Sequence, residues 1–274
     1  MLDRMFGFLV SGFVFPGLSS DNILIGIGLA LAFGAVWFAM YWTPVLKKSW
    51  SWAVLVSSFI LSWIAVSFLQ IPLQLLTGQA LTSFLSNEII MKWLLLAGLP
   101  GILYSGLVQE GAKLVPVVVY WWSKGKKITP KQGLIAGAVA GLGLGVFEAV
   151  WVHNTVFSSG WTWAAVESGG FMALAFFWER FFVVPAHIAF SAIAGYGLAK
   201  GKGWQFYLFA AALHTLINYS ALLLQSGLIN TVYVEIYVAV VAMGVAGSAL
   251  WLRWRKTEET INLEGEIDPE DLKF

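Results

Sequence analysis

The sequence predicts an all-α membrane protein, a polytopic bundle of seven, or alternatively eight, transmembrane helices. The 274-residue chain is 59% hydrophobic and only 11% charged, with a mean hydropathy of +0.78, whereas soluble domains carry about 25% charged residues. Apolar segments of about 20 residues, long enough to cross a bilayer, recur along the chain. The 15 Trp and 20 Phe suit aromatic belts at the two membrane surfaces.

Composition also excludes several functions. The chain has no Cys, which rules out disulfides, thiolate metal sites and a cysteine nucleophile. Its net charge is only +1, so nothing in the bulk charge indicates a nucleic-acid partner. We therefore expect a multi-pass protein of the cell membrane whose surroundings are lipid.

The spans follow one another in a single predicted membrane domain, residues 1–255, which precedes an acidic, flexible cytoplasmic tail at 256–274. The apolar run at 5–16 is too short to span and is predicted to be an interfacial helix. Segment 88–123 is ambiguous, because Pro100-Gly101 can divide it. The clear spans lie near 23–43, 52–72, 133–154, 176–199, 204–224 and 230–252.

Basic residues predict the orientation. The segments near 73–87, 155–170 and 225–229, expected to be loops, contain no Lys or Arg. Cytoplasmic loops are rich in these residues. Loops with and without basic residues alternate along the chain only if 88–123 crosses the membrane once. That segment is then a span at 102–123, preceded by an interfacial or re-entrant piece at 86–100. The N-terminus is then outside and the C-terminus cytoplasmic, while an eight-span alternative places Lys124–Lys131 outside. The basic clusters are Lys47-Lys48, Lys124 to Lys131, Lys200 with Lys202, and Arg253 to Lys256.

Six strongly polar residues lie inside the predicted spans. Each is 10 to 15 residues from the cytoplasmic end of its helix, which places all of them at a depth of roughly 15–22 Å. A charge at this depth costs about 2.5–3.5 kcal/mol, so their common level on four helices predicts a functional site. They are Glu110, Lys113, Glu148, His187, His214 and Asn218.

Other features are interpreted structurally. Gly137, Gly141 and Gly145 form a stripe of small residues beside Glu148, which predicts close packing of a neighbouring helix. His153 and Asn154 are expected near water at the outer end of their helix. Glu179 and Arg180 are expected to pair at the interface, with an inward-reaching Arg180 as the alternative.

Two carboxylates and two histidines around a polar pocket favour activation of a water molecule, and hence peptide hydrolysis. His and Asn side chains can donate to a developing oxyanion. We expect no cofactor. The alternative is zinc held by Glu110, Glu148, His187 and His214, since these are competent zinc ligands, although no HExxH motif is present.

Four motifs occur in a characteristic order: QEGAK at 109–113, GLGLGVFEA at 141–149, PAHIAFSAIAGYGL at 185–198 and HTLIN at 214–218. Over residues 100–222, approximately, the chain resembles the CAAX-protease-like superfamily of intramembrane proteases, most nearly its PrsW and YhfC branches. The resemblance implies a glutamic-type intramembrane endopeptidase that cuts a membrane protein or a lipidated peptide.

The resemblance also implies residue roles. Glu110 and Glu148 match the catalytic acids, His187 the central histidine, and His214 with Asn218 the oxyanion motif. Lys113 matches the basic position of an EExxK or EExxR motif and supports Glu110.

Two positions depart from this pattern. Gln109 stands where the branches carry the first acid, and Leu144 stands where they carry Phe. Gln109 is compatible with a divergent enzyme that uses Glu110 and Glu148, with an engineered Glu→Gln variant, or with a silent member that acts as a membrane scaffold or substrate-binding protein. A third possibility is a proton-coupled transporter, but the internal repeats typical of transporters are not evident.

Overall fold

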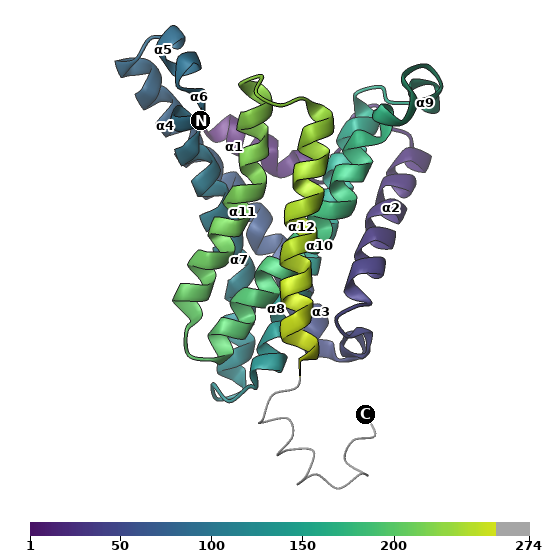
Figure 1. The fold of residues 1–274 in the computed structure, drawn as a ribbon. Coiled ribbons are helices and arrows are strands. Elements are labelled where there is room, and N and C mark those ends of the chain that lie inside the picture. The colour runs from purple at the N-terminus through teal and green to yellow at the C-terminus, as the bar shows by residue number, and fades with distance from the viewer. Residues whose placement is uncertain (256–274) are drawn as a thin grey trace, which may run out of the picture.

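The computed structural model describes residues 1–255, and its long helices stand side by side in one bundle (Figure 1). The first part of the chain forms α1 (Leu2–Ser11), α2 (Ser20–Phe38), η1 (Thr43–Lys47), α3 (Ser49–Ala65), η2 (Val66–Gln70), α4 (Ile71–Phe84), α5 (Asn87–Lys92) and α6 (Leu94–Ala97). The remainder forms α7 (Leu99–Ser123), α8 (Pro130–Ser158), α9 (Trp163–Gly169), η3 (Gly170–Leu174), α10 (Ala175–Ala199), α11 (Gly203–Gln225) and α12 (Thr231–Trp254). No strand occurs in the described range.

Seven helical segments within residues 1–255 are long and apolar enough to cross a membrane. The ambiguous region contributes one crossing, Leu94–Ser123, preceded by the short helix α5. The protein is therefore a multi-pass integral membrane protein, as predicted. The segments are Ser20–Phe38, Ser49–Phe84, Leu94–Ser123, Pro130–Ser158, Trp163–Ala199, Gly203–Gln225 and Thr231–Trp254.

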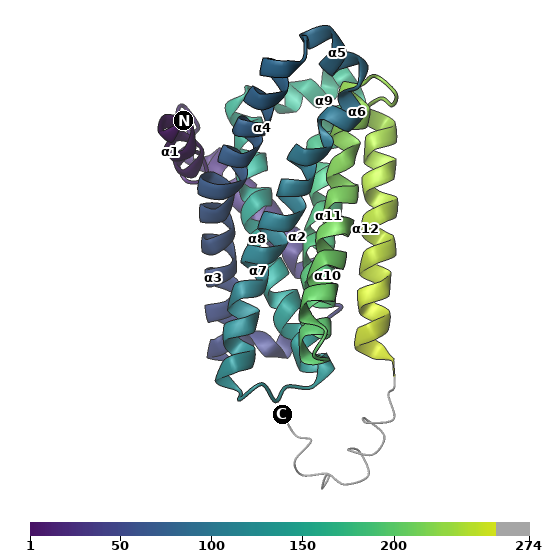
Figure 2. The same ribbon diagram turned by 90° about the vertical axis from the view of Figure 1, so that its left-hand side faces the viewer.

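The two ends of the bundle differ in charge. The connections α7–α8 and α10–α11 and the end of α12 lie together at the end of the bundle opposite α1 and α5 (Figures 1 and 2). These parts carry the lysines and arginines that predict the cytoplasmic side. The sidedness of the chain stays a prediction, and the tail at 256–274 lies outside the described residues.

Two predicted loops are wrong. Most of 73–87 is helix α4, which continues from α3 through the π-turn η2. Pro72 does not break this helix because it occupies the first turn of α4, where the missing amide hydrogen matters least. Segment 155–170 is also largely helical, because α8 runs to Ser158 and α9 follows.

The predicted interfacial helix is α1, which is amphipathic and begins at Leu2. It packs on α3, where Trp63 Nε1 donates a hydrogen bond to the Leu9 carbonyl at 2.9 Å.

The packing of α8 on α10 is the most extensive between any two helices in the described chain. A Cβ atom at Gly137 or Gly141 would collide with the backbone of α10 at Ser191 and His187, respectively. The predicted close approach along this glycine stripe is confirmed. It brings Glu148, one turn beyond Gly145, against the α10 helix that carries His187.

The expectation of water near His153 and Asn154 is wrong, because both side chains are fully buried. His153 Nδ1 lies 3.1 Å from the Gly26 carbonyl, and a Cβ at Gly26 would meet Asn154 at 2.5 Å. Gly26 thus lets α2 cover this part of α8, a contact that the α8 sequence alone does not reveal.

Candidate active site

Four helices bring the predicted polar residues together inside the bundle. Glu110 and Lys113 lie one turn apart on α7, and Lys113 Nζ donates to Glu110 Oε1 at 2.6 Å. Glu148 on α8 lies 2.6 Å from His187 on α10. His214 on α11 completes the group, since its Nδ1 atom lies 2.7 Å from Glu110 Oε1.

The contacts of His187 determine its tautomer. Lys113 Nζ lies 3.1 Å from His187 Nδ1, and an ammonium group can only donate, so Nδ1 accepts. The proton of a neutral ring is then on Nε2, which lies 2.6 Å from Glu148 Oε2 and donates to it. His187 therefore links the two carboxylates of the site through Lys113.

Glu110 is the centre of the buried half of the site. Its Oε1 atom accepts from Lys113 and lies 2.7 Å from His214 Nδ1. The Ser191 hydroxyl approaches the second oxygen, Oε2, at 3.4 Å. Lys113 and His214 thus hold this carboxylate in one orientation.

The two carboxylates differ in exposure. The Glu110 side chain is fully buried, whereas 22% of the Glu148 side chain is exposed. Glu148 is therefore the more accessible acid, and Glu110 is enclosed by its contacts with Lys113 and His214.

Arg180 is a member of the site that the sequence analysis placed mainly at the interface. It pairs with Glu179 at 2.7 Å, as predicted, but its Nη1 atom also lies 3.4 Å from Glu148 Oε1. Arg180 is two turns before His187 on α10, and its long side chain reaches inward along that helix. The inward-reaching alternative is confirmed, and Arg180 places a positive charge beside the accessible acid.

Asn218 and Gln109 lie in an adjoining polar layer and do not contact the carboxylates. Asn218 Nδ2 donates to Ser105 Oγ at 2.8 Å. Gln109 Nε2 donates to the same hydroxyl oxygen and to Gln70 Oε1, each at 3.2 Å. Ser105 and Gln70 were not predicted. Ser105 could have been predicted from its position four residues before Gln109, on the same helix face. Gln70 could not, because the π-turn η2 sets its orientation.

The fold and its interior cluster of acids and histidines define a polytopic membrane protein with a buried site suited to hydrolysis. A family model described as PrsW family intramembrane metalloprotease matches residues 48–246, and the chain belongs to this family of intramembrane proteases. No curated protein and no solved structure gives a significant match. The wider CAAX-protease-like and YhfC resemblances stay predictions.

The family description raises the question of a metal ion. Ligand atoms of Glu110, His187 and His214 lie within 4.8 Å of one another, and all three residues are buried. Two imidazoles and one carboxylate are a ligand set that catalytic zinc uses. Glu148, also a predicted ligand, is not in this group. It would instead orient His187 as a ligand through its hydrogen bond with the Nε2 atom of that ring.

The donor types suit zinc, but a lysine lies among them. Lys113 Nζ contacts Glu110 Oε1 and His187 Nδ1, so a buried ammonium group is next to two of the three ligands. A divalent ion there would face a neighbouring positive charge in a medium of low dielectric constant, where repulsion is strong. In this arrangement the Lys113 charge disfavours a metal ion.

Proposed function

We propose that the chain is a glutamic-type intramembrane endopeptidase, in which Glu148 activates the attacking water. The observation that carries this proposal is the pair of acids with unequal exposure: Glu148 is partly exposed and hydrogen-bonded to His187, whereas Glu110 is fully buried against Lys113 and His214. A carboxylate held by a histidine and an arginine is a suitable general base for water.

In this proposal Glu148 takes a proton from water as the oxygen attacks the carbonyl carbon of the scissile peptide bond. His187 Nε2 holds Glu148 in orientation, and Arg180 balances its charge. When the carbon–nitrogen bond breaks, Glu148 returns the proton to the leaving amine. No bound metal takes part.

His214 and Asn218 are one turn apart on α11 and are the proposed oxyanion donors. Asn218 has a second amide hydrogen beside the one it donates to Ser105. His214 Nδ1 lies against Glu110, which leaves Nε2 as the ring nitrogen available to the oxyanion.

The proposal is tested with purified protein in liposomes and a pool of synthetic membrane-spanning peptides with randomised central residues. We expect new peptide termini by mass spectrometry, at a rate that a strong chelator leaves unchanged. Metal analysis of the same sample is expected to give far less than one ion per chain. Loss of cleavage on chelation, with recovery on adding zinc, would contradict the metal-free mechanism.

Gln109 favours a second function, that of a silent member acting as a membrane scaffold or substrate-binding protein. Its amide replaces the first acid of the family motif and is held by Gln70 and Ser105. A silent chain would release no product from the peptide pool.

Gln109→Glu separates the two functions. Ser105 and, after rotation of its amide, Gln70 can donate to a carboxylate at position 109. We expect this variant to cleave the peptide pool about 10- to 100-fold faster than the wild type, because a second acid adds general acid–base capacity. Gln109→Met is the control without an acid. No product from either the wild type or Gln109→Glu would favour the scaffold.

A further inference from the structure

A small polar hollow lies next to the candidate active site. Its volume is about 190 Å³, and its lining includes three amide side chains, a serine hydroxyl and the inward-reaching arginine. We call this hollow the amide vestibule; its polar lining residues are Gln70, Gln74, Ser105, Glu179, Arg180, Asn218 and Ser220. Through Arg180 it borders Glu148, and through Ser105 it borders Gln109.

Each of the three amides uses one end within the protein and leaves the other free. Gln74 Nε2 donates to the Gly101 carbonyl at 2.8 Å, Gln70 Oε1 accepts from Gln109, and Asn218 Nδ2 donates to Ser105. Gln70 Nε2, Gln74 Oε1 and Asn218 Oδ1 form no hydrogen bond within residues 1–255. None of these three atoms is sealed from the hollow.

The vestibule therefore offers neutral donors and acceptors inside a membrane domain. Its two charged members, Glu179 and Arg180, are paired with each other, and Arg180 also lies beside Glu148, so neither is free to select an ion. Unpaired backbone amides are costly in lipid, and side-chain amides present the same kinds of donor and acceptor that a peptide main chain needs. We infer that the amide vestibule binds the main chain of the substrate beside the scissile bond.

The free amide ends of the vestibule indicate the conformation of that segment. An intact helix pairs its own main-chain N–H and C=O groups, so only a locally unwound segment leaves such groups free to pair with the vestibule. A membrane-spanning substrate must therefore unwind locally to bind there. This inference rests on the proposed peptidase function and names the form in which its substrate is recognised.

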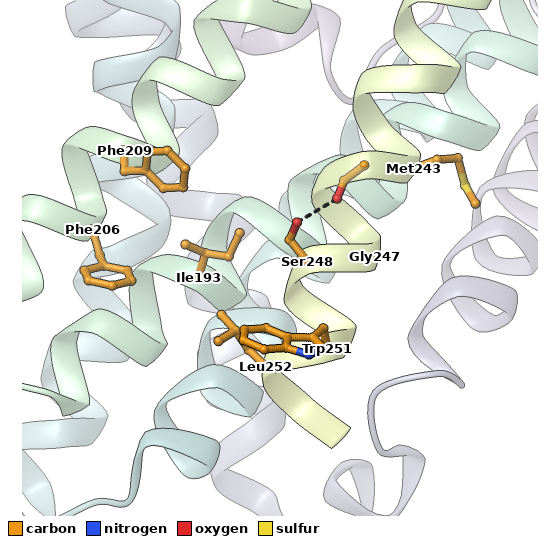
Figure 3. A pocket seen from close by; sticks show the side chains of 9 residues that line it. Ile193, Phe206, Phe209, Met243, Gly247, Ser248, Trp251 and Leu252 are labelled. Carbon is orange, nitrogen blue, oxygen red and sulfur yellow. Dashed lines mark hydrogen bonds between the residues drawn. The ribbon is translucent and has the colours of Figure 1, made fainter. Parts of the chain in front are cut away.

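A larger hollow between α11 and α12 provides a contrast. It measures about 530 Å³ and is lined mainly by apolar side chains, including Phe206, Phe209, Met243 and Trp251 (Figure 3). Its one hydroxyl, on Ser248, is bonded to the Gly244 carbonyl within α12. This groove offers only the Trp251 indole N–H and the Ser248 hydroxyl and contains no side-chain amide, which makes Met243 a suitable comparison site.

Photocrosslinking tests the binding directly. A benzophenone amino acid replaces Gln74, or for comparison Gln79 or Met243, in a Glu148→Gln background, which keeps the fold and prevents cleavage of the probe. The probes are two leucine–alanine membrane-spanning peptides, one an uninterrupted helix and one with a central Gly-Pro pair. We expect position 74 to capture the Gly-Pro peptide at least about 10-fold more than the uninterrupted peptide, whereas Gln79, exposed on the same helix, and Met243 capture neither selectively.

Kinetics give a second readout. Gln74→Met and Gln70→Met are expected to raise KM for a cleaved peptide about 10-fold, as for the loss of one hydrogen bond, with kcat changed less than about 3-fold. Gln79→Met is the matched control and leaves both unchanged. Equal capture at positions 74 and 79, or an unchanged KM in both vestibule variants, would overturn the inference. Selective capture at position 74 without any cleavage would support the binding of an unwound main chain in the vestibule and would contradict the peptidase function.

Discussion

Lys113→Met is expected to convert the site into a zinc site and to lose peptide cleavage. Lys113 contacts Glu110 Oε1 and His187 Nδ1, two of the three groups whose ligand atoms lie within 4.8 Å of one another. Methionine fills a similar volume without the charge. Removing the ammonium group leaves two imidazoles and a carboxylate free to bind one ion.

The loss of activity has a separate cause. Without Lys113 nothing donates to His187 Nδ1, so the ring is no longer held in the tautomer that donates to Glu148. We expect cleavage of the peptide pool to fall at least about 10²-fold, a typical loss for one preorganised electrostatic contact. Breaking the buried Lys113–Glu110 pair costs about 3–5 kcal/mol of stability, and added zinc should restore much of it.

Zinc binding is measured by isothermal titration and by metal analysis after dialysis. The wild type is expected to retain almost none and Lys113→Met about one ion per chain, with a rise in melting temperature only in the variant. Lys92→Met, at an exposed lysine of α5, is the control. Stoichiometric zinc in the wild type that His187→Ala or His214→Ala releases would show that the ammonium group does not exclude the metal.

Counting residues from helix ends predicted most of the polar groups that meet, but it also placed Asn218 among them, which lies in the adjoining polar layer. Glu110, Glu148, His187 and His214 lie on four different helices, yet each was placed at a similar depth, and they are joined by contacts of 2.6 to 3.1 Å through Lys113. The method works because a span has a fixed rise of about 1.5 Å per residue. It requires only the helix boundaries and no knowledge of which helices are neighbours.

The same method gives depth but not the reach or rotation of a side chain. Arg180 begins two turns from His187 and still contacts Glu148, because long basic side chains extend along a helix. His153 and Asn154 lie near a helix end but are covered by α2, which comes close only because residue 26 is glycine. Both outcomes depend on a partner helix that the local sequence does not identify.

The adjoining polar layer was missed for a different reason. Gln70 reaches Gln109 from the π-turn η2, which a regular count of 3.6 residues per turn does not anticipate. Such turns are frequently found at functional sites. Neutral residues such as Gln70 and Ser105 also carry a smaller penalty in lipid than charges do, so they attract less notice in an apolar segment.

Glu148→Gln is expected to abolish catalysis while leaving the fold intact. The carboxylate accepts from His187 and pairs with Arg180, and an amide of the same shape can keep the first contact through its oxygen. It cannot take a proton from water. We expect cleavage of the peptide pool to fall about 10³-fold, within the range for loss of a general base, with a melting temperature close to that of the wild type.

Glu110→Gln tests whether Glu110 stabilises the site, in contrast to the catalytic role of Glu148. The Glu110 carboxylate is fully buried between Lys113 and His214. Neutralising it leaves the lysine charge uncompensated, at a cost of about 3–5 kcal/mol. This variant should therefore lose both activity and stability, whereas Glu148→Gln loses only activity.

Glu235→Gln is the matched control, an acid on α12 whose Oε2 atom is buried without a hydrogen-bond partner in the described chain, and it should retain cleavage. The double variant Glu110→Gln/Glu148→Gln should be no less active than Glu148→Gln alone, because residues that act as one unit are not additive. Full cleavage by Glu148→Gln would assign the water to another group, and equal destabilisation by both single substitutions would contradict the division of roles between the two acids.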